Sequence, residues 1–240
     1  NRIYITEGGY SFAGYRVATL SDMELSHASG AVAFNNELVV QGALTATGGG
    51  DLSFGGPTTV VKNATLNSKS LSVTGNMTVL GNLAITSGSS DVGGAGSFTL
   101  GTGVTLSAAN ISLDVDAGAA TDSDFSAIKA TMQGNISTKG ELSITGTAAK
   151  AFTGAVSAGS ISVDTGSSNV VSFQSVTANT MTVAEGSTVN MLTGGNIGIG
   201  SIELGGTLGF ATFAEEYRKY NIITTSENAN VTFESITKVY

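Results

Sequence analysis

The chain has 240 residues, of which 41% are hydrophobic and 12% are charged, with 33 glycines, one proline and no cysteine. This balance excludes a disordered chain, and the lack of cysteine excludes a disulfide framework, a cysteine-ligated zinc site and a thiol nucleophile. The net charge of −8 comes without the clustered Lys and Arg that nucleic-acid binding requires, so we expect no nucleic-acid partner.

No apolar run approaches the ~20 residues of a membrane-spanning helix. No positively charged segment precedes an apolar stretch at Asn1. We therefore expect either a mature, processed chain or a fragment of a longer one.

Residues 70–85, SLSVTGNMTVLGNLAI, contain nearly the same six-residue pattern three times. Apolar residues at i and i+2 alternate with Ser, Thr or Asn, which is the period of a β-strand and not of a helix. The three copies predict short strands on consecutive faces, or in neighbouring rungs, of one coil.

The same motif recurs over residues 141–206 with leading apolar residues 19, 20 and 21 positions apart. Two further apolar groups occupy each interval, and Gly, Asn or Ser ends each segment. This spacing predicts an all-β, parallel β-solenoid with about 20-residue rungs, because one rung cannot bury its apolar side alone. A β-sandwich of short strands is the alternative, but the chain lacks the Asn-Gly and Asp-Gly signals of hairpins. The leading residues are Leu142, Ile161, Met181 and Ile202.

One interval is longer than a rung. From Ile111 to Leu142 there are 31 residues, and Phe125, Ile128 and Met132 within it have helical spacing. We expect an insert near residues 117–134 that contains a short helix over residues 122–134. A second short helix is predicted over residues 212–220, where Thr212 and Glu215 match a capping box.

We expect a single β-solenoid domain over residues 1–240. Residues 1–56 form N-terminal rungs and a cap, residues 57–206 form regular rungs, and residues 207–240 form a C-terminal cap. The six tyrosines support caps at the two ends, where open sheet edges would otherwise recruit other chains. They are Tyr4, Tyr10, Tyr15, Tyr217, Tyr220 and Tyr240.

The only histidine, His27, lies in DMELSHASG, for which we expect a loop or short helix. No G-x-S-x-G motif accompanies it, so a structural histidine is favoured over a catalytic base. The stretch DVDAGAATDSD offers carboxylates that suit calcium, although it fits no EF-hand pattern, and helix capping by the second pair is the alternative. No other cofactor is expected. The calcium candidates are Asp114, Asp116, Asp122 and Asp124.

A glycosidase needs two carboxylates facing one sugar, and Asp164, Glu185 and Glu203 follow the apolar pairs of successive rungs. A solvated outer face explains these residues more simply. GGNIGIG at residues 194–200 lacks the spacing of a phosphate-binding loop and is interpreted as corner glycines. We assign no catalytic residue. Five Asn-x-Ser/Thr sequons begin at Asn63, Asn76, Asn110, Asn135 and Asn230.

The chain resembles the passenger of an autotransporter, an exported right-handed β-helix of Gram-negative bacteria. The resemblance is carried by GGYSFAG (8–14), ALTATGGGDLSFGG (43–56), the central rungs, and YNIITTSENANVTFESI (220–236). The family usually places Gly before the Phe of this last segment, where the chain has Thr232. The resemblance implies secretion or attachment to the outer membrane through a downstream barrel that is not in this chain.

We therefore expect a non-enzymatic adhesin or rigid display stalk at the cell surface. Its partner would be a host-cell surface, matrix or glycan ligand. Two alternatives remain: a carbohydrate-active β-helix enzyme, either a polysaccharide lyase or a glycoside hydrolase, and a fibre module of a phage or appendage.

Overall fold

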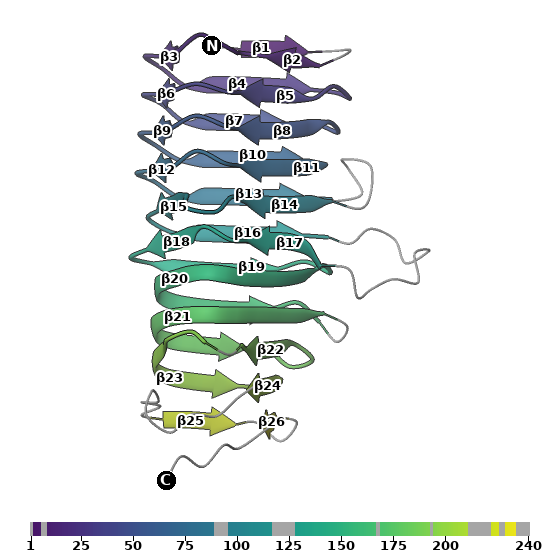
Figure 1. The fold of residues 1–240 in the computed structure, drawn as a ribbon, viewed down its shortest axis with the longest axis vertical. Helices are drawn as coiled ribbons and strands as arrows, with labels where there is room; N and C mark the ends of the chain where they lie inside the picture. The colour runs from purple at the N-terminus through teal and green to yellow at the C-terminus, as the bar shows by residue number, and fades with distance from the viewer. Residues whose placement is uncertain are drawn as a thin grey trace.

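The chain winds into a rod of stacked parallel strands (Figure 1). The computed structural model describes residues 2–5, 9–88, 96–116, 128–166, 169–192, 194–210, 222–225 and 229–233. Within these ranges all regular structure is β-strand, and each strand pairs with the strand one turn away in the parallel sense. The predicted β-solenoid is confirmed, and the β-sandwich, which requires antiparallel strands, is excluded. These ranges contain no helix that could cross a membrane.

Each turn of the solenoid contributes to three faces, which we call A, B and C in chain order. Face A consists of β1 (Arg2–Ile5), β4 (Met23–His27), β7 (Leu44–Thr47), β10 (Ala64–Ser68), β13 (Leu83–Ser87), β16 (Ile111–Val115), β19 (Glu141–Thr145) and β25 (Ile222–Thr225). Face B consists of β2 (Tyr10–Ser11), β5 (Val32–Phe34), β8 (Asp51–Phe54), β11 (Ser70–Val73), β14 (Ser97–Leu100), β17 (Ile128–Met132), β22 (Thr188–Met191), β24 (Thr207–Phe210) and β26 (Asn230–Phe233). Face C consists of β3 (Val17–Thr19), β6 (Leu38–Val40), β9 (Thr58–Val60), β12 (Met77–Val79), β15 (Thr105–Ala108) and β18 (Asn135–Thr138).

Three long strands turn corners without a break. β20 (Ala149–Asp164) and β21 (Val170–Val183) each run through faces B, C and A, and β23 (Ile197–Leu204) runs through C and A. They lie in the teal to yellow-green part of the rod in Figure 1. The chain therefore keeps the same three faces where single strands run through the corners.

The predicted register is confirmed on face A. Leu142 pairs with Ile161, Ile161 with Met181, and Met181 with Ile202, and all four side chains are buried. In-register stacking places like side chains one strand spacing apart, so each covers the apolar surface of the next. One hydrophobic cluster built in this way extends from Met23 to Phe210.

The repeat in residues 70–85 occupies the three faces of a single turn. Leu71 lies on β11, Met77 on β12 and Leu83 on β13, and all three side chains point inward. Of the two arrangements expected from the sequence, consecutive faces is the correct one.

The predicted helix is wrong at residues 128–132. They form β17, which pairs with β14 on one side and β20 on the other, and Ala130 and Met132 are buried in the core. The same residues fit both a helical and an alternating pattern, and pairing on both sides decides for the strand. Residues 117–127, with the rest of the predicted helix, lie outside the described residues, as do residues 212–220 of the second.

Candidate functional site

Two connections between faces A and B are longer than the others. Residues 89–95 separate β13 from β14, and residues 117–127 separate β16 from β17; both segments lie outside the described residues. Since β13 pairs with β16 and β14 with β17, the described residues at the ends of both segments lie at the same corner in successive turns. We call this place the insert corner.

The base of the first insert is closed by two glycines in tight contact. Gly88 has a φ of +86°, and a Cβ there would collide with the backbone of Gly96. The buried Ser87 hydroxyl lies within hydrogen-bond distance of two carbonyl oxygens, that of Lys69 in the preceding turn (2.8 Å) and that of Ser97 across the gap (3.0 Å). The two ends of the insert are thus fixed to the rod.

Asp116 connects the bases of the two inserts. Its backbone N–H donates to the Ser87 carbonyl at 2.8 Å, and its own carbonyl accepts from the Gly96 N–H at 2.9 Å. Its carboxylate Oδ1 accepts from the backbone N–H (2.8 Å) and hydroxyl (3.0 Å) of Thr147 in the next turn. One residue therefore ties three successive turns together at this corner.

Beside Asp116 a lysine is buried in the core. Lys150 on β20 is 1% exposed, and it pairs with the small Ala130 in the neighbouring turn. Its Nζ donates to three carbonyl oxygens, those of Val115 (3.3 Å), Gly146 (3.0 Å) and Ala148 (2.8 Å). Three acceptors match the three N–H groups of an ammonium, which explains how a cation is tolerated there.

Burial lowers the pKa of Lys150 to about 8, against the opposing effect of Asp114 and Asp116, whose negative charges raise it. The ammonium still carries its proton at neutral pH. It therefore places a positive charge near Asp114 and Asp116, two of the carboxylates that were considered for calcium.

The calcium candidates divide into two pairs. Asp116 is used as a corner cap, and Asp114 lies on β16 close to Gly146. Asp122 and Asp124 lie outside the described residues. Within the described ranges no three His, Cys, Asp or Glu side chains come together as metal ligands.

His27 ends strand β4, so the predicted loop or short helix is wrong there. The segment Met23–His27 alternates inward and outward, and pairing with β1 and β7 on either side holds it extended. The imidazole is fully buried, and neither ring nitrogen has a hydrogen-bond partner in the part of the chain that is described. Burial lowers the pKa of His27, while the Gly30 backbone and Asp51 oppose the change. The ring lies over Gly48, where a Cβ would be 2.8 Å from its Cγ.

The three carboxylates considered for glycosidase chemistry do not form one row. Glu203 is in register with Thr182, whereas Asp164 is in register with Thr145 two positions further along face A. Glu185 lies beyond the end of β21, in the corner that follows. Stacking of the turns therefore does not bring two of these carboxylates face to face.

Asparagines line the corner where face C leads into face A. The Oδ1 of Asn63 accepts from the backbone N–H of Asn82 (2.9 Å), and the Nδ2 of Asn110 donates to the Oδ1 of Asn82 (2.9 Å). The Oδ1 of Asn110 in turn accepts from the N–H of Glu141 (2.8 Å). A shallow groove of about 290 Å³ runs beside this row.

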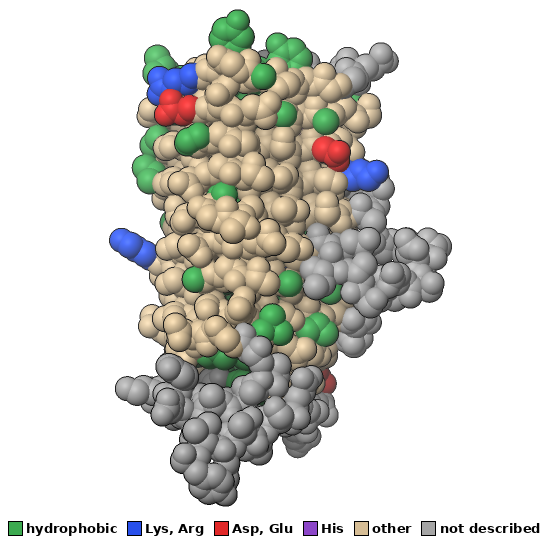
Figure 2. Space-filling view, viewed as in Figure 1, with side chains coloured by type: hydrophobic (Ala, Val, Ile, Leu, Met, Phe, Trp, Pro, Cys, Tyr) green, Lys and Arg blue, Asp and Glu red, His purple; other side chains and the backbone are tan. Residues whose placement is uncertain are grey.

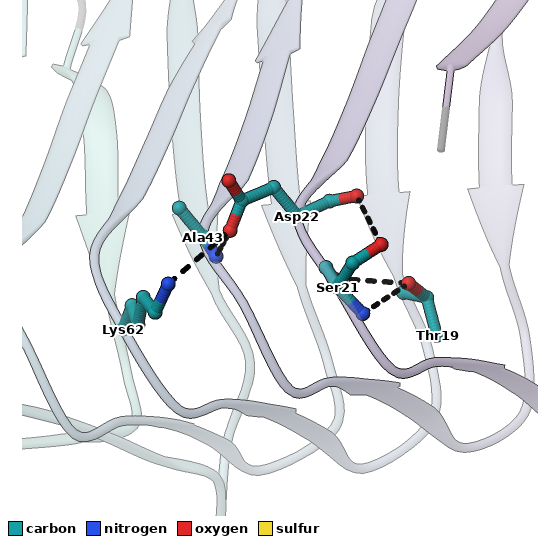
Figure 3. A network of polar contacts seen from close by, with 5 residues as sticks. All are labelled: Thr19, Ser21, Asp22, Ala43 and Lys62. Atoms are coloured by element: carbon teal, nitrogen blue, oxygen red, sulfur yellow. Dashed lines mark hydrogen bonds and ion pairs between the residues drawn. The ribbon is translucent and has the colours of Figure 1, made fainter.

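Nearer the N-terminus, Asp22 also accepts a backbone hydrogen bond from the next turn at the corner between faces C and A (Figure 3). Its Oδ1 accepts from the Ala43 N–H at 2.8 Å and lies 3.7 Å from the Nζ of Lys62. The Ala43 hydrogen bond, with help from the Lys62 charge, lowers the pKa of Asp22. At the same corner the Thr19 hydroxyl donates a hydrogen bond to the Ser21 carbonyl oxygen at 2.9 Å.

The face of the rod shown in Figure 2 carries little charge among the described residues. In the view of Figure 2, charged side chains are few, and hydrophobic ones are scattered except at the N-terminal end. The exposed large hydrophobic residues include Tyr10, Tyr15 and Leu20 in that end, and Leu80 further along. The Tyr10 ring packs against Phe12 at 4.7 Å, and Phe12 stacks on Phe34.

Sequence reasoning missed the first insert, the Lys150 carbonyl cluster and the hydrogen bonds of Asp116. The 28 residues between Leu83 and Ile111, which pair directly, were a usable signal for the insert. Nothing in the sequence marks Lys150 as buried. Comparison with protein-family models, curated proteins and solved structures found no significant match.

Proposed function

We propose that the chain is a non-enzymatic β-solenoid passenger, displayed at the cell surface or secreted, which serves as an adhesin or display stalk. The observation that carries the proposal is the insert corner. The strands that flank two long connections end and begin at one corner in successive turns, while the apolar ladder Leu83, Ile111 and Leu142 keeps its register through these turns. A rod that tolerates inserts without losing its register can present them to a partner.

The base of the inserts supports this role. Asp116 links successive turns, and Lys150 fixes the carbonyls of Val115, Gly146 and Ala148. A rigid base reduces the conformational entropy that a contact segment loses on binding. The partner we propose is a host-cell surface, a matrix protein or a glycan.

The experiment replaces residues 117–127 with a Gly/Ser linker of the same length. Binding of the labelled chain to cultured cells, matrix proteins and a glycan array is compared with that of a matched variant in which residues 89–95 are replaced. We expect the melting temperature to stay within a few degrees of the parent, with binding lost in at least one variant.

Full binding by both variants would contradict display by the insert corner. Release of reducing ends from polysaccharides by the unmodified chain would contradict the non-enzymatic role and favour a carbohydrate-active enzyme instead. Both assays use the whole chain, so a negative result in one leaves the other interpretable.

A further inference from the structure

In three corner asparagines the side-chain oxygen and the side-chain nitrogen have different surroundings. The Oδ1 atoms of Asn63, Asn76 and Asn135 each accept a hydrogen bond from a backbone N–H in the next turn, at 2.9, 2.9 and 3.0 Å. All three side chains are exposed, and their Nδ2 atoms have no partner among the described residues. The structural hydrogen bond therefore needs only the carbonyl end of each amide.

Asn110 differs from these three. Its Oδ1 also accepts from a backbone N–H, but its Nδ2 is held at 2.9 Å from the Oδ1 of Asn82. Both ends of its amide are engaged in the corner. The side chain of Asn230 lies outside the described residues.

Each of these asparagines begins an Asn-x-Ser/Thr sequon, and the strand that follows sets the direction of its side chains. After Asn63, Ala64 is buried and Thr65 is exposed; after Asn135, Ile136 is buried and Ser137 is exposed. Residues i and i+2 of an extended segment share a side, so hydroxyl and amide face solvent together.

The hydroxyl of Thr78, which belongs to the Asn76 sequon, is less accessible. Thr78 is half-buried, and its Oγ1 accepts from the Ser107 hydroxyl at 3.4 Å. The Asn63 and Asn135 sequons are thus the two in which both recognition groups are exposed and unpaired among the described residues.

We propose that Asn63 and Asn135 are acceptor sites for N-linked glycosylation of the folded rod. The substrate is a nucleotide-activated sugar. The Nδ2 of the asparagine attacks the anomeric carbon, the C–N bond forms as the bond from that carbon to the diphosphate oxygen breaks, and the nucleoside diphosphate leaves. Nδ2 gives up one proton, which passes to the leaving diphosphate or the solvent, and keeps the other, and Oδ1 keeps its hydrogen bond to the next turn. This inference does not depend on adhesion.

The test incubates the purified, folded chain with UDP-glucose and a soluble N-glycosyltransferase that recognises Asn-x-Ser/Thr. Intact mass and peptide mapping follow each site with time. We expect one hexose at Asn63 and one at Asn135, added several-fold faster than at Asn110, and an unchanged melting temperature after modification.

Matched variants identify the sites. Thr65→Ala and Ser137→Ala should each remove one hexose while keeping the asparagine cap, and Ser112→Ala, in the Asn110 sequon, should change little. The urea-unfolded chain is run in parallel. The proposal is overturned if only the unfolded chain is modified, if neither form is modified at these two sites, if Asn110 reacts as fast as Asn63, or if the attached hexoses lower the melting temperature.

Discussion

The Nζ of Lys150 lies 2.8 Å from the carbonyl oxygen of Ala148, two residues earlier in the chain. With the Val115 and Gly146 carbonyls it forms a cluster in which a positive charge replaces an apolar side chain of the core. The cluster lies directly under the insert corner. The behaviour of this lysine is therefore a direct probe of how the inserts are supported.

Lys150→Met should destabilise the rod. Methionine fits the apolar surroundings, but three carbonyl oxygens lose their donor, each at a cost of about 1–3 kcal/mol, and relief from burying a charge offsets part of this. We expect a net loss of about 2 kcal/mol in the free energy of unfolding, measured by urea denaturation. Lys139→Met, at an exposed lysine, is the matched control and should change it little. A Lys150→Met chain as stable as the parent would contradict the role of the cluster.

Lys150 also predicts a dependence of stability on alkaline pH. Its pKa is about 8 in the folded chain, against an ordinary value of 10.5, so the unfolded chain binds more protons between these values. Stability should therefore be lowest below about pH 8 and should rise towards pH 10.5, with a full difference of roughly 3 kcal/mol. Urea denaturation at pH 7.5, 8.5 and 9.5 measures the rise. Lys150→Met should lose it, Lys139→Met should keep it, and a parent chain that weakens across this range would disprove the prediction.

His27 predicts the behaviour at acid pH. Burial lowers its pKa below the ordinary 6.5, so on acidification the unfolded chain takes up this proton first. Stability should be retained above pH 6.5 and lost as the pH falls through it. As the chain has no other histidine, melting temperatures from pH 7.5 to 5.5 isolate this effect. His27→Leu should melt at nearly the same temperature across the range; an equal fall in both chains would assign the effect elsewhere.

Asp116 can be tested by substitutions that separate charge from hydrogen bonding. Asp116→Ala removes both contacts to Thr147 and should cost about 1–2 kcal/mol, whereas Asp116→Asn keeps an acceptor and should cost less. Because the Lys150 ammonium near Asp114 and Asp116 opposes the approach of a second cation, adding calcium should leave the melting temperature of the parent unchanged. A calcium-dependent rise that Asp116→Asn abolishes would show instead that a metal binds here.

The stacked aromatic pair tests the ladder itself. Phe152 and Phe173 are fully buried in neighbouring turns, with ring centroids 4.7 Å apart. Phe173→Ala should cost about 3–5 kcal/mol, because it leaves a cavity between two turns that cannot collapse. Phe173→Leu fills more of the space and should cost less. Equal losses in the two variants would mean that cavity size does not set the cost.

Some features could not have been resolved from local patterns. Ile128, Ala130 and Met132 satisfy strand alternation, whereas Phe125, Ile128 and Met132 satisfy helical spacing, so periodicity alone does not decide. His27 likewise ends a segment whose neighbours leave loop, helix and strand open. In both places pairing with the turns above and below holds the chain extended.

The sequence by itself determined the solenoid, its 20-residue rung and the ladder from Leu142 to Ile202, since each rung must repeat its apolar pattern to cover the previous one. Only the tertiary structure decided which polar residues enter the core and what the corner residues bind. Lys150 can be buried because the Val115 carbonyl from the preceding turn joins those of Gly146 and Ala148, just before it in the chain, around its Nζ. Asp116 and the corner asparagines cap N–H groups some 20 or 30 residues away. Such partners are fixed by stacking, which no local stretch of sequence records.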